Sequence, residues 1–284
     1  MKFMIITGKI NEIRAQVKAW KKEGLSVGFV PTMGYLHEGH QSLIARAVKE
    51  NDRVVVSIFV NPMQFGPTED LASYPRDLEK DSALCEATGA HMIFHPEPEE
   101  MYAPDFCSYV DMSGLTEELC GLSRPVHFRG VCTVVAKLFH IVCPDRAYFG
   151  QKDAQQLAIV TRMVRDLNMD VEVIGCPIVR EDDGLAKSSR NTYLTPKERT
   201  AALVLSKAIR LGESLVKEGE TDCKKIIQAM TELIQSEPLA RIDYIKIVDA
   251  LSMEQIPTID RPILCAMAVY IGNTRLIDNF TTTI

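Results

Sequence analysis

Short apolar runs alternate with stretches in which apolar residues recur every three to four positions, as far as about residue 180. The short runs predict buried strands, and the periodic stretches predict helices that cover a sheet. Strands are predicted at Ser26–Val30, Arg53–Val60, His91–Phe94, Arg146–Phe149 and Val171–Gly175, and helices through Leu43–Val48, near Pro75–Thr88, around Val131–Val142 and over Asp153–Leu167. This alternation predicts an α/β fold with a Rossmann-like, doubly wound parallel sheet.

The pattern changes beyond Arg180. Two longer helical segments are followed by two apolar runs, Arg241–Ala250 and Ile263–Gly272, which predict paired strands. Thr195 and Pro196 predict a helix start, because threonine caps helices and proline suits their first turn. We therefore predict two domains: residues 1–180 with the parallel sheet, and residues 181–284 as a smaller α+β domain.

Composition narrows the class of protein. The chain has 284 residues, of which 46% are hydrophobic and 25% charged, as in a globular protein with a packed core. A formal charge of −6 disfavours general electrostatic binding of nucleic acid. No apolar run approaches the roughly 18 residues of a membrane span, and the eight cysteines form no Cys-x-x-Cys pair. We expect a cytoplasmic protein with reduced thiols that acts on small molecules.

The stretch Val30–Asn51 carries the chemistry, because it joins a predicted strand to a predicted helix. Ligands of such sheets bind beyond the strand ends, where helix N–H groups favour anions. Gly34 and Gly39 permit a close backbone approach, and His37 and His40 would face the same side. Two imidazoles there could donate to phosphate oxygens. A zinc site and two purely structural histidines are the alternative interpretations.

Several motifs together resemble one family. "PTMGYLHEGH" resembles the nucleotide-binding signature of the pantoate–β-alanine ligase family, within the wider His-x-Gly-His nucleotidyltransferase superfamily. Further resemblance lies in "VVVSIFVNPMQFG", "YPRDLEKD", "SRPVHFRGVCTVVAKLF", "YFGQKDAQQL", "DGLAKSSRNTYL" and "RLIDN". These motifs occur in the family's order and span nearly the whole chain.

The resemblance implies ATP-dependent condensation of pantoate with β-alanine, through an enzyme-bound pantoyl adenylate, to give pantothenate, AMP and pyrophosphate. It implies that residues 1–180 bind nucleotide and pantoate and that residues 181–284 close over the active site. ATP is implied as substrate, Mg²⁺ as its companion ion, and a homodimer as the assembly.

The resemblance also assigns residues. His40, His37 and Lys152 are implied in catalysis, and Asp81 is the candidate magnesium ligand. Pantoate and β-alanine are implied to contact Gln64, Gln156, Asn61 and Arg129. The implied ATP-binding residues are Pro31, Thr32, Met33, Gly34, Tyr35, Leu36, His37, Glu38, Gly39, His40, Gly150, Gln151, Lys152, Asp153, Val179, Lys187, Ser188, Ser189 and Arg190.

Two positions depart from the family's common pattern: Gln151 stands where glutamate is usual, and Lys187 where an apolar residue is frequent. Each motif also has a plainer interpretation, because Asn-Pro is an ordinary turn signal and Lys152 could be a solvated lysine at a helix end. Two other functions stay open. One is a nucleotidyltransferase that stops at a nucleotide adduct, and the other is a non-catalytic protein that binds adenine nucleotides.

Overall fold

The computed structural model describes residues 4–67 and 69–282, and the chain forms two compact units. Unit 1 contains the described residues up to Met112 together with Val126–Gln151 and Ile159–Pro177. Unit 2 contains Ser113–Pro125, Lys152–Ala158 and the described residues from Ile178 onwards. Each unit is therefore assembled from segments that are separated along the sequence.

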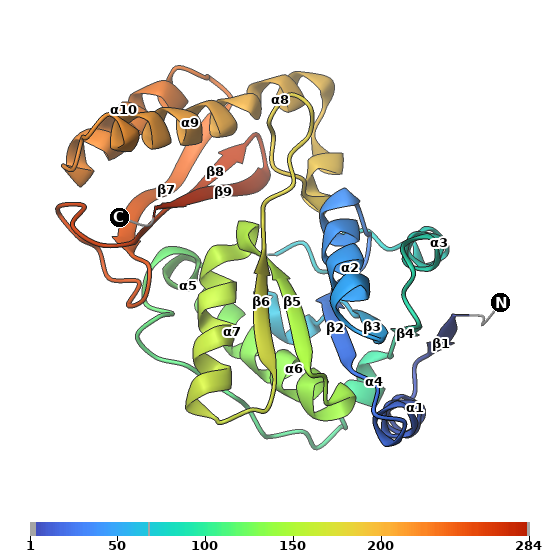
Figure 1. Ribbon diagram of the computed structural model, residues 1–284. Helices are drawn as coiled ribbons and strands as arrows, with labels where there is room; N and C mark the ends of the chain where they lie inside the picture. Colours follow the sequence, from blue (N-terminus) through green and yellow to red (C-terminus); the bar gives the residue numbers. More distant parts are fainter. Residues whose placement is uncertain (1–3, 68, 283–284) are drawn as a thin grey trace. The chain divides into compact units, whose positions relative to one another are not determined.

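Unit 1 is built on a six-stranded parallel sheet (Figure 1). Its strands are β1 (Ile5–Thr7), β2 (Val27–Thr32), β3 (Arg53–Ile58), β4 (Met92–Phe94), β5 (Arg146–Gly150) and β6 (Glu172–Cys176). They lie in the order β1-β4-β3-β2-β5-β6, so the winding direction reverses between β2 and β5. The predicted α/β fold with a doubly wound sheet is confirmed.

Helices pack on both faces of this sheet. The unit carries α1 (Ile10–Lys22), α2 (Glu38–Glu50), α3 (Leu78–Thr88), α4 (Pro98–Met101), α6 (His127–Val142), the carboxyl-terminal part of α7 (Ala154–Asp166), and the 3-10 turns η1 (Pro62–Gln64) and η2 (Gln151–Asp153), the last shared with unit 2. α2 and α3 share a buried cluster with alternate residues of β3, such as Val54 and Val56. On the other face, Phe139 of α6 meets Phe29 in a T-shaped arrangement, with ring centroids 6.4 Å apart.

The ends of two helices differ from their predicted positions. α3 begins at Leu78 rather than at Pro75, because the Asp77 carboxylate caps it by accepting the Lys80 N–H at 3.0 Å. α6 begins at His127 rather than near Val131, since polar side chains in its first turn conceal the helical pattern. The strand β1 and the helix α1 are absent from the predicted elements.

Unit 2 combines an antiparallel sheet with helices (Figure 1). Its elements are α5 (Leu119–Ser123), the start of α7, the 3-10 turn η3 (Ser189–Tyr193), α8 (Pro196–Ala201), α9 (Leu203–Lys217), α10 (Cys223–Gln235), β7 (Ala240–Asp249), β8 (Ile263–Ile271) and β9 (Thr274–Thr282). The sheet order is β7-β8-β9, and α9 and α10 pack against it over one apolar core. Thr195 and Glu198 form a capping box, which confirms the predicted helix start.

One amide explains why Ser113–Pro125 belongs to unit 2. Gln155, which is buried, accepts the Cys120 N–H at 2.9 Å through Oε1. Its Nε2 donates to the carbonyl oxygens of Leu115 and Glu118, both at 2.8 Å. Three bonds from one side chain thus fix this segment against the start of α7.

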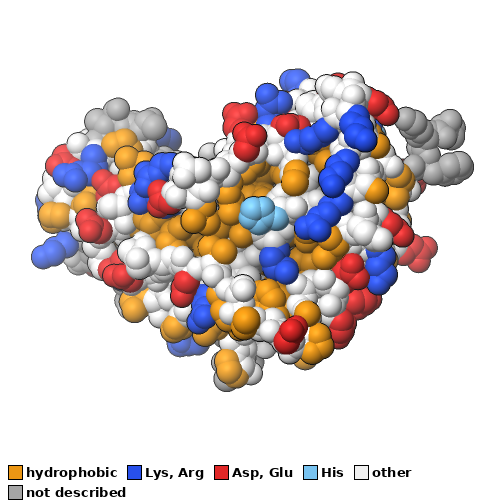
Figure 2. All heavy atoms as spheres, turned by 90° about the horizontal axis from the view of Figure 1, so that it is seen from below, with side chains coloured by type: hydrophobic (Ala, Val, Ile, Leu, Met, Phe, Trp, Pro, Cys, Tyr) orange, Lys and Arg blue, Asp and Glu red, His pale blue; other side chains and the backbone are white. Residues whose placement is uncertain are grey.

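The surface mixes charges of both signs. On the face in Figure 2, Lys and Arg side chains are interspersed with Asp and Glu side chains and with hydrophobic patches. Such a mixture does not give that face the field of a general polyanion-binding surface. Among the helices of residues 4–67 and 69–282, none has the length and apolar composition needed to cross a membrane.

Candidate active site

The candidate site in unit 1 lies where the winding of the sheet reverses. β2 ends with Pro31 and Thr32, and β5, its parallel neighbour, ends with Gly150. The loops that follow both strands therefore leave the sheet at the same edge, and ligands of doubly wound sheets bind at this kind of point. An added Cβ at Gly150 would meet no atom within 4 Å, so the backbone there is open to close approach.

The loop from Met33 to Leu36 has an unusual backbone. Gly34 has φ of 82° and Tyr35 has φ of 51°, both in the left-handed region. For a tyrosine this conformation costs about 1–3 kcal/mol, so surrounding contacts must hold it. Thr32 supplies one contact, since its Oγ1 accepts the Gly34 N–H at 3.2 Å and donates to the Ser57 carbonyl at 2.7 Å.

The two histidines cap α2 together. His37 precedes the helix and accepts the Gly39 N–H on its Nδ1 at 3.1 Å, while the His37 N–H donates to the Nδ1 of His40 at 3.3 Å. The ring centroids are 4.1 Å apart. Because both Nδ1 atoms act as acceptors, each neutral ring carries its proton on Nε2. The first turn of α2 thus presents ring N–H donors beside the positive end of its dipole.

Asn61 and Gln64, two of the predicted pantoate- and β-alanine-binding residues, follow the neighbouring strand β3. Asn61 caps η1 and donates from Nδ2 to the Gln64 Oε1 at 3.0 Å and to the Gly130 carbonyl at 3.1 Å. Gln64 in turn donates from Nε2 to the Met33 sulfur at 3.1 Å. Asn61 also accepts from the Tyr102 hydroxyl at 2.7 Å. The structure therefore brings together Met33, Asn61 and Gln64, which stand in separate motifs of the sequence.

Gly130 is expected to be indispensable for the placement of this group. A Cβ added at Gly130 on α6 would lie 2.3 Å from the Met63 carbonyl oxygen and 2.6 Å from the Gln64 Cα. These are backbone atoms, so Gly130→Ala must displace η1 or α6. We expect a loss of about 1–3 kcal/mol in unfolding free energy, the usual cost of overpacking. Denaturant unfolding measures this loss.

The matched control is Gly66→Ala, because an added Cβ there would meet nothing closer than 3.8 Å. This variant should keep the parent's unfolding free energy, whereas Gly130→Ala should also raise the KM of the substrate that contacts Gln64. Equal stability of the two alanine variants would show that η1 tolerates the extra methyl group.

The Asp81 carboxylate is buried and bonded to the backbone, whereas a magnesium ligand beside a bound nucleotide would have to be accessible. Its side chain is 1% exposed, and its two carboxylate oxygens accept the N–H groups of Tyr35 and Leu36 at 2.8 and 2.6 Å. Burial raises the pKa of this carboxyl, and the two backbone hydrogen bonds oppose that rise. No cluster of three or more His, Cys, Asp or Glu suited to a metal occurs among residues 4–67 and 69–282. Asp81 therefore does not fit the predicted role of a magnesium ligand.

Arg129 lies on an exposed part of α6. Its guanidinium stacks 4.1 Å above the Tyr109 ring and lies 3.9 Å from the Asp111 carboxylate. These contacts differ from those of the Asn61–Gln64 pair, so the structure does not join Arg129 to that group.

In unit 2, the predicted phosphate-binding residues follow a tight hairpin. The Lys187 N–H donates to the Val179 carbonyl at 3.0 Å, and Ser188 caps η3 by accepting the Arg190 N–H at 3.3 Å. Ser189 and Arg190 form the first residues of η3. Val179, Lys187 and Ser188–Arg190 are therefore held in one short structural element.

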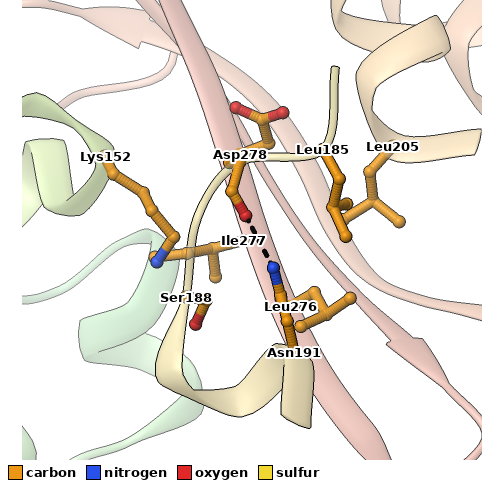
Figure 3. A pocket seen from close by; sticks show the side chains of 9 residues that line it. Lys152, Leu185, Ser188, Asn191, Leu205, Leu276, Ile277 and Asp278 are labelled. Carbon is orange, nitrogen blue, oxygen red and sulfur yellow. Dashed lines mark hydrogen bonds between the residues drawn. The ribbon is translucent and has the colours of Figure 1, made fainter. Parts of the chain in front are cut away.

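Of these residues, Ser188 lines a small cavity together with Lys152 (Figure 3). The cavity has a volume of about 10 Å³, which is about the room that one water molecule needs. Asn191 and Asp278 also line it. Asn191 donates from Nδ2 to the Ala186 carbonyl at 3.1 Å and to the Glu181 carboxylate at 3.0 Å. The structure thus gathers Lys152 and Ser188, which are far apart in sequence.

Ion pairs stabilise the hairpin that precedes η3. Arg180 donates to both oxygens of Asp278, at 2.7 and 2.9 Å, and these hydrogen bonds raise the pKa of the guanidinium. Burial opposes ionisation of Glu181, but hydrogen bonds from Arg199 and Asn191 outweigh it and lower the pKa of this carboxyl. The hairpin that precedes η3 is therefore held in place by the ion pairs of Arg180 and Glu181.

The other predicted residues lie around η2 and α7. Gln151 is exposed at the end of unit 1, and the exposed Asp153 carboxylate is 4.0 Å from the Lys152 Nζ. Gln156 is half-buried in the first turn of α7. The Lys152 carbonyl accepts the Asn279 Nδ2 at 2.8 Å, which fixes the backbone beside the lysine.

Asn191 and Asp278 are absent from the predicted site residues, although both line the cavity with Lys152. A signal for each was present, since Asn191 ends "KSSRN" and Asp278 stands in "RLIDN". The Asn191 Oδ1 is buried without a hydrogen-bond partner among the described residues, so it is a candidate acceptor for a water or ligand N–H.

These features define a class. A doubly wound sheet with a glycine-containing loop and a helix amino end at its switch point is the architecture of mononucleotide-binding α/β proteins. The family model for pantoate-beta-alanine ligase matches residues 5–281. The chain therefore belongs to the pantoate–β-alanine ligase family, whose reaction is ATP-dependent synthesis of pantothenate.

Individual relatives agree with this membership. The chain is 69% identical to the pantothenate synthetase of Ruminiclostridium cellulolyticum over 272 residues, 96% of each chain. It is 46% identical to the pantothenate synthetase of Thermus thermophilus, whose crystal structure it matches with a TM-score of 0.92 over 98% of this chain and 99% of that one. The Francisella tularensis ligase, solved with beta-gamma ATP and β-alanine, is 33% identical, with a TM-score of 0.81 over 98% and 97%.

Proposed function

We propose that this ligase activates pantoate with ATP and transfers the pantoyl group to β-alanine, and that its His37–His40 pair binds the phosphates. The observation that carries this proposal is the histidine pair capping α2 at the switch point of the sheet. The Francisella relative, solved with an ATP species and β-alanine, supports the same ligands for this chain.

In the first step, a pantoate carboxylate oxygen attacks the α-phosphorus of ATP. A new O–P bond forms, the bond to the β-phosphate oxygen breaks, and pyrophosphate leaves with the electron pair. Negative charge shifts over the phosphate oxygens during this displacement. The ring N–H groups of His37 and His40 and the amino end of α2 are the proposed donors that stabilise such charge. Lys152, Ser188 and Arg190 are the proposed further contacts to the triphosphate.

In the second step, the amine of β-alanine attacks the acyl carbon of the pantoyl adenylate. The amide C–N bond forms, the bond to the AMP oxygen breaks, and the amine loses a proton. Gln64 and Gln156 are proposed to bind pantoate, because an amide side chain can donate a hydrogen bond to a carboxylate and accept one from a hydroxyl. Holding both substrates in line can contribute about 7–11 kcal/mol toward the barrier.

Magnesium is proposed to enter with ATP and to neutralise phosphate charge. Its ligands would be phosphate oxygens and water rather than Asp81, whose carboxylate oxygens already accept two backbone N–H groups. We further propose a cytoplasmic homodimer in which residues 181–284 close over the substrates. The eight free thiols fit a reducing compartment, and sedimentation would test the dimer.

The test is a reaction of purified protein with ATP, magnesium, pantoate and β-alanine, in which AMP and pantothenate are both measured. Equal amounts of the two products are expected. Omission of β-alanine should leave a pantoate-dependent exchange between pyrophosphate and ATP. Formation of ADP, or AMP without amide, would refute the reaction. A stable nucleotide adduct would identify a nucleotidyltransferase instead, and ATP binding without chemistry would identify a non-catalytic protein.

A further inference from the structure

We infer that Asp81 is a positioning residue, whose carboxylate fixes the backbone from which the histidine pair projects. The inference rests on the proposed role of that pair at the phosphates. Asp81 occupies the first turn of α3, and α3 packs against α2 in unit 1. Its carboxylate connects α3, whose buried residues are Asp81 and Cys85, to the loop that precedes α2.

The hydrogen bonds of Asp81 are made to consecutive backbone groups. Oδ2 accepts the Tyr35 N–H at 2.8 Å, and Oδ1 accepts the Leu36 N–H at 2.6 Å. One planar carboxylate therefore sets the orientation of the peptide between these residues. Hydrogen bonds to an ionised acceptor are about twice as strong as neutral ones, so the carboxylate form matters.

The backbone needs this support because it is strained. Tyr35 has φ of 51°, a conformation that glycine adopts freely and tyrosine does not. The loop also fits closely, since a Cβ added at Gly34 would lie 3.0 Å from the Asp81 Oδ2. The next residue, Leu36, is buried in the cluster shared by α2 and α3, and His37 follows it directly. A change at Asp81 is thus transmitted through two residues to the first ring.

Burial removes Asp81 from the solvent side of the site. Its side chain is 1% exposed, and desolvation raises the pKa of the carboxyl. Neither feature suits a ligand that must meet a hydrated ion arriving with a nucleotide. The same carboxylate is well suited to fix the loop, because its two oxygens accept the N–H groups of Tyr35 and Leu36.

Asp81→Asn tests the inference, because asparagine keeps the size but replaces one acceptor oxygen with a donor. We expect kcat to fall by roughly 10- to 100-fold, as for other displacements of a reacting group by about 1 Å. The magnesium concentration for half-maximal activity should not change. In protein labelled on histidine, the ring NMR signals of His37 and His40 should shift, and those of His140 on α6 should not. Glu79→Gln, which removes a charge from an exposed position in the same turn, should change none of these.

Rescue provides a second variant. Glycine at position 35 adopts a positive φ without strain, so Asp81→Asn should shift the ring signals less in a Tyr35→Gly protein than in the wild type, but the shift should not disappear, because the carboxylate still orients the Leu36 N–H. If Asp81→Asn alone does not accumulate as folded protein, the double variant is compared with Tyr35→Gly in the same way. The same ring signals in those two proteins would then overturn the inference.

Three outcomes would contradict the positioning role. A higher magnesium requirement with unchanged ring signals would make Asp81 a metal ligand. A lower melting temperature with unchanged turnover per folded enzyme would make its role purely structural. Unchanged kcat, ring signals and melting temperature together would remove any role. The NMR comparison needs no substrate, so it decides the inference even if the wild-type protein makes no pantothenate.

Discussion

His40→Ala is expected to lower kcat by about 10²- to 10⁴-fold, the range that a positioned donor or acid contributes. His40 is the third residue of α2, and its ring lies 4.1 Å from that of His37. Removing it eliminates a ring donor where phosphate charge shifts. Steady-state turnover at saturating ATP and pantoate measures the effect.

The loss of His40 also breaks the capping box, which should cost about 0.5–2 kcal/mol of stability. The melting temperature of His40→Ala must therefore be measured before its turnover is interpreted. His140→Ala is the matched control, because His140 is exposed on α6 and outside the candidate site. Turnover of His40→Ala equal to that of the control would remove His40 from catalysis.

Asp278→Ala is expected to lower the stability of unit 2 by about 3 kcal/mol, near the lower end for breaking a buried ion pair. The Asp278 side chain is 1% exposed and accepts two hydrogen bonds from Arg180, which keeps 28% of its own side chain exposed. That partial exposure lets water compensate part of the loss. Hydrogen exchange of the amides in β7, β8 and β9 measures the change.

The control for Asp278 is Asp260→Ala. Asp260 pairs with Arg261 at 2.6 Å, but the two side chains are 59% and 52% exposed. Pairs of this kind contribute about 0–1 kcal/mol, so exchange in the sheet should stay close to that of the parent. Equal exchange in the two variants would show that Asp278 contributes no more than a surface charge.

The parts of the fold with a strong periodic pattern were predictable. β2, β3 and α2 have continuous or amphipathic apolar patterns. Gly34 and His37 lie between β2 and α2, and Gly39 and His40 lie in the first turn of α2. β9 was not predictable in this way, since Asp278 and Asn279 interrupt its apolar pattern although both are buried. Their burial is explained by partners on distant segments, Arg180 and the Lys152 carbonyl.

The same limit applies to the site. Met33 and Gln64 could be proposed from their motifs, and they meet because β2 and β3 are neighbours in the sheet. Asp81 could be recognised as important from its motif. Its partners, the backbone N–H groups of Tyr35 and Leu36, could not be recognised, because this pairing depends on how α3 packs on α2. Sequence reports which groups are present, while packing decides whether a carboxylate faces solvent or a backbone N–H.

The segmented origin of the two units limits how the gene can be divided. The chain passes between them at 112/113, 125/126, 151/152, 158/159 and 177/178. A polypeptide cut near residue 180 would retain Ser113–Pro125 but lack β7 and β8, against which α5 packs. Neither half would be complete, so during synthesis on the ribosome the amino-terminal portion must wait for the last strands to emerge before all of its chain can be buried.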